Sequence, residues 1–102
     1  MKKEVEYLLD HGLAVPSKSP WASPCLLVPK KDGQFRLFVD CVRVNSVTVS
    51  DAYPLPRVDE LVDSVEQLKF ITKIDLLKGY HQIPLTERAQ LISAFVTPFG
   101  LY

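Results

Sequence analysis

One acidic side chain stands where a metal-dependent reaction could begin. Asp75 ends an apolar, strand-like run that starts at Phe70, and Gly79 and Tyr80 follow shortly after it. A strand holds a carboxylate rigidly, and a following turn can direct backbone N–H groups toward phosphate oxygens. This order is typical of the start of a metal-dependent nucleotidyl-transfer site. Only one acidic strand end of this kind is present, so we expect the sequence to carry half of a catalytic centre.

Basic side chains lie on a predicted β-hairpin. Two β-prone runs, Cys25–Pro29 and Phe35–Asp40, are separated by a KKDGQ segment whose Asp-Gly pair favours the positive φ angles of a tight turn. Apolar residues alternate along the second run, so Arg36 is predicted to point away from the buried face. For Lys30 and Lys31, beside the turn, two interpretations stay open: they bind phosphate, or they form the solvated tip of the hairpin.

Hydrophobic periodicity predicts two helices. The first runs from Lys3 to His11, with Gly12 placed to end it. The second begins at Val58, after an irregular connection that contains two prolines, and it has acidic residues in its first turn. We expect its apolar stripe to pack behind the sheet. The stripe consists of Val58, Leu61, Val62, Val65 and Leu68.

The C-terminal third is predicted to add strands. We expect strands over Phe70–Asp75, Tyr80–Leu85 and Ser93–Thr97, with a helical turn over Glu87–Gln90 that is capped by Thr86. No repeat or linker divides the chain. The predicted fold class is therefore α+β, with a partly antiparallel sheet and packed helices in one domain that covers residues 1–102.

Composition excludes several classes of protein. Hydrophobic residues make up 47% and charged residues 24%, as in ordinary globular proteins, and no apolar run approaches the roughly 20 residues of a membrane span. The N-terminal residues show no secretory cleavage signal, so we expect an intracellular protein, cytoplasmic or nuclear. The formal net charge is zero, which means that any binding of nucleic acid must be local.

Cysteine and histidine do not form a metal-binding pattern. Cys25 and Cys41 have no close partner in the sequence, which favours reduced, structural thiols over a disulfide scaffold. With His11 and His81 they lack the paired short spacing of a zinc site.

Six segments in a fixed order identify a family resemblance. The chain resembles the reverse transcriptase domain of long-terminal-repeat retrotransposons, especially the gypsy-like branch, over nearly its whole length. The segments that carry the resemblance are LLDHGLAVPSKSPWASPCLLVPKKDG, FRLFVD, VNSVT, YPLPRVDEL, KIDLLKGYHQIPL and SAFVTPFG. The resemblance implies the fingers and the first part of the palm of an RNA-directed DNA polymerase, which is a nucleotidyltransferase.

The resemblance also implies a role for each matching residue. Asp75 matches the first catalytic carboxylate, which bridges two magnesium ions in the complete enzyme. The backbone N–H groups of Lys78 and Gly79 match those that approach the incoming deoxynucleoside triphosphate (dNTP). Tyr80 matches the steric gate that excludes a ribose 2′-hydroxyl.

Two further residues of the dNTP site are implied in the hairpin. Lys30 and Arg36 match basic fingers residues that hold the triphosphate, and the planar guanidinium fork suits phosphate oxygens. One departure lies nearby. The family usually has V-D-Y-R where this chain has V-D-C-V, so an aromatic ring and an arginine are lost, and Arg43 follows one position late.

The resemblance implies partners and a limit on activity. The complete enzyme acts on a primer-template of RNA or DNA, and ribonuclease H and integrase domains follow in the polyprotein. The family's paired-aspartate hairpin lies beyond Tyr102, so we expect this chain to be a truncated piece that binds magnesium weakly and does not polymerise DNA alone. The alternative is a non-catalytic retroelement remnant, or a module co-opted to bind nucleic acid or protein. For the isolated chain we expect exposed apolar surface.

Overall fold

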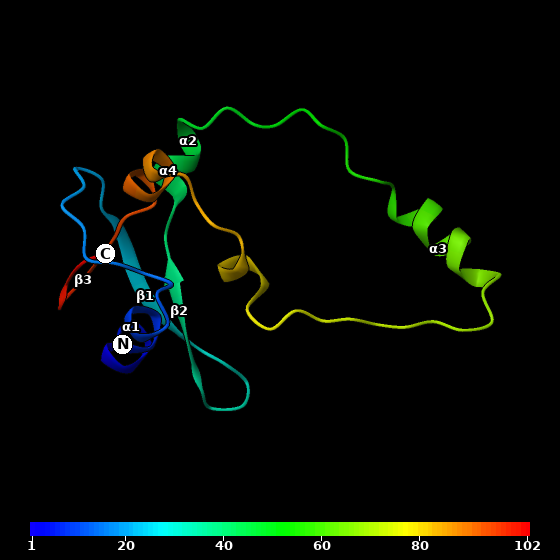
Figure 1. Ribbon diagram of the computed structural model, residues 1–102, viewed down its shortest axis with the longest axis horizontal. Coiled ribbons are helices and arrows are strands. Elements are labelled where there is room, and N and C mark those ends of the chain that lie inside the picture. Colours follow the sequence, from blue (N-terminus) through cyan, green and yellow to red (C-terminus); the bar gives the residue numbers. More distant parts are fainter.

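The computed structural model describes all residues from Met1 to Tyr102 and has a four-stranded mixed sheet with short helices around it (Figure 1). The predicted α+β class is confirmed. In chain order the elements are α1 (Lys2–Asp10), β1 (Ser23–Pro29), β2 (Phe35–Val39), α2 (Val42–Ser46), α3 (Val58–Glu66), the 3-10 turn η1 (Gly79–Gln82), α4 (Glu87–Ile92), β3 (Phe95–Thr97) and β4 (Gly100–Leu101).

The sheet has the strand order β2-β1-β3-β4, so β1 has a neighbour on each side. It pairs with β2 in antiparallel register, with Leu27 opposite Leu37, and this confirms the predicted hairpin. At the turn, Gly33 has φ +80, and the Asp32 carboxylate accepts a hydrogen bond from the Gln34 N–H at 3.1 Å. The Asp-Gly pair therefore does form the tight turn.

The two ends of the chain are joined where β1 meets β3. These strands run parallel, with Ser23 opposite Phe95. Just before β1, the buried hydroxyl of Ser19 donates to the Leu91 carbonyl at 2.5 Å and accepts from the Trp21 N–H at 3.0 Å. These contacts hold α4 and the C-terminal strands against the start of β1.

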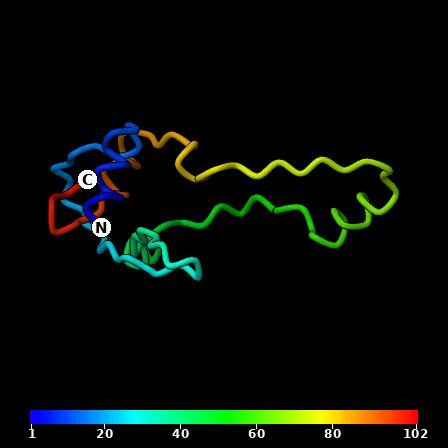
Figure 2. Tube along the Cα trace, turned by 90° about the horizontal axis from the view of Figure 1, so that it is seen from below, coloured from blue at the N-terminus to red at the C-terminus, as the bar shows by residue number.

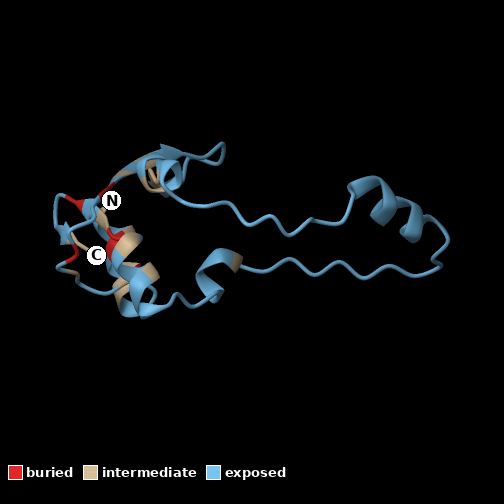
Figure 3. Cartoon of the chain, turned by 90° about the horizontal axis from the view of Figure 1, so that it is seen from above, coloured by how far each residue is buried: buried red, intermediate tan, exposed pale blue.

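We call the part formed by α1, the sheet and α4 the body, and its core is small. Six of the 102 residues are buried, and three of these are apolar: Val5, Leu8 and Ala94. Two of the three lie on one side of α1, which agrees with the predicted amphipathic helix, and Gly12 with φ +66 follows its end. Figure 3 shows the buried residues gathered at the end of the molecule that holds both termini.

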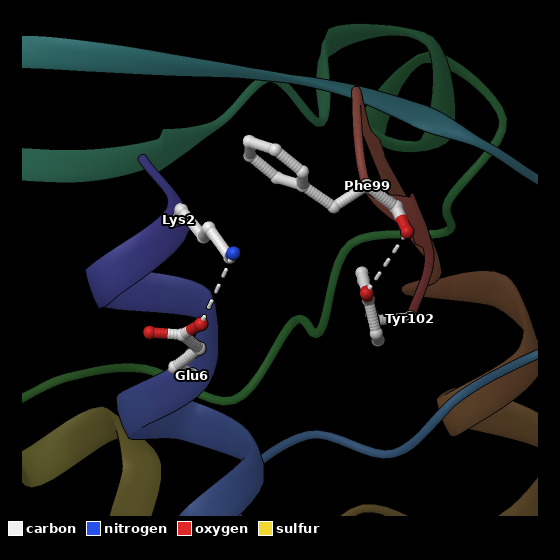
Figure 4. A network of polar contacts seen from close by, with 4 residues as sticks. All are labelled: Lys2, Glu6, Phe99 and Tyr102. Carbon is white, nitrogen blue, oxygen red and sulfur yellow. Dashed lines mark hydrogen bonds and ion pairs between the residues drawn. The ribbon is translucent and has the colours of Figure 1, made fainter.

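Two polar contacts at this end lie on the surface (Figure 4). Lys2 and Glu6 form an ion pair of 3.8 Å along α1, and pairs of this exposed kind stabilise little. The Tyr102 hydroxyl donates to the Phe99 carbonyl at 3.2 Å, which closes the turn between β3 and β4.

Residues 47–86 leave the body and return to it, with α3 at the far end (Figures 1 and 2). This excursion makes the chain extended. Its radius of gyration is 17.8 Å, against about 13 Å for a compact chain of this length. Its accessible surface is 9443 Å², against about 5,800 Å² for a folded monomer of 11.5 kDa.

Two predictions fail in this excursion. The strands expected over Phe70–Asp75 and Tyr80–Leu85 are wrong: the first run is coil, and the second begins in η1 and continues as coil. The apolar pattern was present, but no strand edge lies beside these runs to accept their backbone hydrogen bonds. Helix α3 is confirmed as an element, yet its apolar stripe is exposed and does not back the sheet.

Two short helices border the excursion. Helix α2 was not predicted, and it follows Asp40, whose carboxylate accepts from the Val42 N–H at 3.0 Å. Helix α4 confirms the expected helical turn and runs two residues further than predicted. The Thr86 hydroxyl accepts from the Ala89 N–H at 3.3 Å, as the predicted cap requires. No helix combines the length and the apolar character that crossing a membrane requires.

The Ser19 hydrogen bonds predict a measurable loss of stability. In Ser19→Ala the Leu91 carbonyl loses its donor, and we expect the free energy of unfolding to fall by about 1–3 kcal/mol. Urea titration followed by Trp21 fluorescence measures this change. The control is Ser64→Ala, because that exposed hydroxyl bonds only within α3, and its effect should stay below about 0.5 kcal/mol. Equal effects of the two substitutions would contradict the role of Ser19 in holding α4 against the start of β1.

Candidate functional site

The hairpin brings two predicted phosphate-binding residues together. Arg36 lies opposite Val28 in the β1–β2 register, and the Lys30 N–H donates to the Gln34 carbonyl at 2.6 Å, so Lys30 and Arg36 lie near each other at the turn end of the hairpin. They line a shallow hollow of about 450 Å³. The lining residues are Val28, Pro29, Lys30, Lys31, Asp32 and Arg36.

The hollow is electropositive. Lys30, Lys31 and Arg36 supply three cationic groups, whereas Asp32 is the one acid in the lining. None of these cations forms an ion pair, since the two ion pairs of the chain are Lys2–Glu6 and Arg57–Asp59. The hollow can therefore accept an anion, and Arg36 can offer two parallel N–H donors to phosphate oxygens. Because the hairpin is exposed, salt will screen this attraction.

The second group of predicted residues lies on a turn at the base of the excursion. Lys78 has a left-handed backbone with φ 50 and precedes η1, Gly79 is half-buried, and the Tyr80 side chain is 95% exposed. Lys78 Nζ lies 3.5 Å from the centroid of the Tyr7 ring on α1. This cation–π contact joins the turn to α1. The left-handed backbone of Lys78 costs energy in any residue other than glycine.

Sequence reasoning missed the aromatic support of this turn. The Tyr7 ring also stacks on His11, with a centroid distance of 4.0 Å, and His11 Nδ1 lies 2.8 Å from the Tyr7 carbonyl oxygen. The spacing of four residues on a helix could have revealed the Tyr7–His11 pair. Nothing local could have revealed the contact with Lys78, because the two residues are far apart in the sequence.

Asp75 does not form a metal site with the other residues of this chain. Its side chain is exposed on a coil, and no three His, Cys, Asp or Glu side chains gather closely enough to hold an ion. Magnesium requires near-octahedral oxygen ligands, and a two-ion site requires several carboxylates. The donor set around Asp75 therefore does not fit two magnesium ions.

The two groups of residues do not share one cleft. A second, larger hollow of about 1030 Å³ lies between the segment after α1, residues 80–85 and α4, and it includes Tyr80. Neither Asp75 nor any hairpin cation lines it, and Tyr80 is absent from the hairpin hollow. The structure thus assembles the predicted phosphate-binding pair but does not place Asp75 and Tyr80 opposite it.

The inner face of the hairpin is apolar and includes a thiol. Cys25 is half-buried on β1, opposite Val39, and both cysteines are free, as the sequence predicted. Burial raises the pKa of the Cys25 thiol above its ordinary value, because the thiolate loses hydration.

Comparison with known proteins identifies related sequences. Residues 28–100 match the family described as "Reverse transcriptase (RNA-dependent DNA polymerase)", so the match begins at the hairpin and includes the turn after Asp75. The retrovirus-related Pol polyprotein from transposon 297 of Drosophila melanogaster is 36% identical over 107 residues, which cover 100% of this chain and 10% of that protein.

Other relatives give the same result. The Pol polyprotein from transposon gypsy of Drosophila melanogaster is 35% identical over 108 residues, with 100% of this chain and 10% of that protein covered. The enzymatic polyprotein of cauliflower mosaic virus (strain Strasbourg) is 36% identical over 104 residues, with 98% and 15% covered. The chain spans about a tenth of the length of the curated transposon relatives it matches.

The raised pKa of Cys25 predicts slow alkylation. At neutral pH less of this thiol is ionised than in an unfolded peptide, and only the thiolate reacts. We expect iodoacetamide to modify Cys25 more slowly in the folded chain than in a peptide of residues 21–29, with the difference shrinking as the pH rises past the thiol pKa. Mass spectrometry of the digested chain measures both rates. Equal rates would show that β1 does not bury this side chain.

Proposed function

This chain belongs to the reverse transcriptase family, and we propose that it forms the fingers and the first part of the palm of an RNA-directed DNA polymerase within a retrotransposon polyprotein. The observation that carries this proposal is the hairpin hollow, which gathers Lys30 and Arg36 inside the matched region. This chain spans about a tenth of the length of its relatives. The activity of the whole polymerase is therefore part of the proposal.

In this proposal the hairpin and the turn bind the dNTP. Lys30 and Arg36 hold the triphosphate from the hairpin, since both are cationic, exposed and free of acidic partners. The backbone N–H groups of Lys78 and Gly79 approach the phosphates from the turn. The Tyr80 ring excludes a ribose 2′-hydroxyl, and its near-complete exposure leaves the ring free to meet a sugar.

Asp75 supplies one carboxylate ligand to a magnesium site that other residues complete. A single aspartate brings too little charge and too few ligands for two ions, so the chain alone does not polymerise DNA. In the complete polyprotein the partners are a primer-template of RNA or DNA, with ribonuclease H and integrase domains downstream, in an intracellular setting.

One observation favours a second candidate function. The structure gathers the phosphate-binding cations, whereas it leaves Asp75 without other metal ligands. A module that binds nucleic-acid phosphates without catalysis would need only the first of these features. The second candidate is therefore a non-catalytic remnant that binds nucleic acid through the hairpin.

The role of Asp75 is tested in a polyprotein-length polymerase that contains this chain. We expect Asp75→Asn to lower magnesium-dependent primer extension by at least about a thousandfold, the scale of the several kcal/mol that metal coordination contributes. Binding of a labelled primer-template should persist. The control is Asp63→Asn on α3, which should retain activity.

Retained extension in Asp75→Asn would refute the metal role. Primer-template binding without extension in the unsubstituted protein would favour the non-catalytic candidate instead.

The gate role of Tyr80 predicts a change in sugar selectivity. In the same polymerase, Tyr80→Ala should lower the preference for dNTPs over ribonucleotides by about one to two orders of magnitude, because a steric exclusion is removed. Tyr80→Phe keeps the ring and should keep the preference. Single-nucleotide incorporation with paired dNTP and ribonucleotide substrates measures the ratio of kcat/KM values. An unchanged ratio in Tyr80→Ala would place the gate elsewhere.

A further inference from the structure

Lys78 is the one residue other than glycine with a left-handed backbone, at φ 50 and ψ 47. This conformation brings Cβ close to the following carbonyl oxygen, so lysine adopts it only where neighbouring contacts hold it. Within the turn, the His81 N–H donates to the Lys78 carbonyl at 3.0 Å, and Gln82 Nε2 donates to the Leu77 carbonyl at 2.9 Å. Both bonds are local, and neither joins the turn to another element.

Tyr7 on α1 supplies a connection between this turn and the body. Lys78 Nζ lies 3.5 Å from the centroid of the Tyr7 ring, a distance at which a cation and an aromatic face attract each other. The ammonium group meets no carboxylate, since Lys78 takes part in neither ion pair of the chain. The Tyr7 ring is therefore the partner of this charged group.

The Tyr7 ring is itself held in place by α1. The side chain is half-buried, and the same helix places Val5 and Leu8 in the core. The ring stacks on His11 with centroids 4.0 Å apart, and His11 Nδ1 lies 2.8 Å from the Tyr7 carbonyl oxygen. Because the ring is fixed in this way, the Lys78 side chain can act as a tether, by which we mean the cation–π contact that links the turn to α1.

The tether leaves backbone donors as the groups that the turn can offer to a phosphate. Neither the Lys78 N–H nor the Gly79 N–H donates a hydrogen bond within the chain. Successive N–H groups in a turn of this kind can converge on an anion. The ammonium group is thus engaged by the ring, whereas these two N–H groups are free to donate.

We propose that Tyr7 is a positioning residue for the dNTP, because it holds the Lys78 side chain and thereby keeps the turn in the shape that presents the Lys78 and Gly79 N–H groups. This inference rests on the proposed function, in which those groups approach the triphosphate. It assigns the Lys78 side chain to the tether and not to the phosphates. When the tether is lost, the turn samples other conformations, and the apparent affinity falls with the fraction that stays competent.

The test is single-nucleotide incorporation by the polyprotein-length polymerase. We expect Tyr7→Leu to raise the KM for dNTP about three- to tenfold, the scale of one cation–π contact, and to leave kcat within about twofold. The KM changes alone because the tether acts on binding and not on the chemical step. Tyr7→Phe keeps the aromatic face and should restore the KM. Glu6→Gln, an exposed neighbour on α1, is the control and should leave both constants unchanged.

A double substitution separates the tether from a general structural role of Tyr7. Lys78→Ala removes the other end of the contact at an exposed position, so it disturbs no core packing. It should raise the KM as much as Tyr7→Leu, and the double variant should show no further rise, because both changes remove the same contact. Effects that multiply would overturn the proposal. A KM that falls in Tyr7→Leu would also overturn it, since the freed ammonium group would then bind the phosphates directly.

The contact itself can be measured without nucleotide. In proton NMR spectra of the 102-residue chain, the Tyr7 ring should shift the Lys78 ε-methylene protons upfield, and this shift should vanish in Tyr7→Leu and persist in Tyr7→Phe. Far-UV circular dichroism checks that each variant keeps its helices. Absence of the shift from the unsubstituted chain would overturn the proposal.

The outcomes distinguish this inference from the proposed function. A polymerase that extends primers with a KM unchanged by Tyr7→Leu overturns the positioning role alone. An unsubstituted polymerase that binds no dNTP overturns the proposed function, and the positioning role with it.

Discussion

The fold depends on the contact that joins the start of β1 to the C-terminal elements. Ser23 and Pro24 pair in parallel with β3, and the Ser23 N–H donates to the Ala94 carbonyl at 2.9 Å. Nearby, the Ser17 N–H donates to the Leu101 carbonyl at 2.9 Å, and Ser19 bonds to Leu91. Without these bonds β1 would have only β2 as a neighbour, and an isolated two-stranded hairpin is marginally stable in water. The closing contact therefore supports the hairpin that carries the basic hollow.

This contact also explains why the arm of residues 47–86 can leave the body without opening it. The entropic cost of closing a loop rises slowly with the length of the loop, by about 0.6 kcal/mol for each doubling. Residues 47–86 thus add little to the cost of bringing β1 and β3 together. What they do add is uncovered apolar surface, from α3 to the exposed side chains of Phe70, Ile74 and Leu77. The unfavourable feature of this structure is the exposure of the arm's apolar side chains to water. Any apolar surface that covers these side chains will stabilise the arm.

Local elements could be predicted from the sequence, whereas their partners could not. The Asp32-Gly33 turn, the Thr86 cap and the register that turns Arg36 outward each depend on residues a few positions apart, and the structure confirms them. Strand formation over Phe70–Asp75 and burial of the α3 stripe depend on a second surface, which an apolar pattern indicates but does not identify. The same division holds for the site. The proximity of Lys30 and Arg36 was predictable because one hairpin carries both, but the contact of Tyr7 with Lys78 was not.

The two halves of the candidate site make different demands on rigidity. Phosphate attraction by exposed cations acts over several ångströms in water, so a hairpin supported on one side can supply it. Metal coordination requires ligands at about 2.0–2.1 Å in near-octahedral geometry, which an exposed coil cannot maintain around Asp75. A functional metal ligand at this position therefore requires the run before the Lys78 turn to be ordered by something that packs on the arm. The hairpin can attract an anion whether or not the arm is covered. Metal chemistry at Asp75, in contrast, requires a surface that covers the arm.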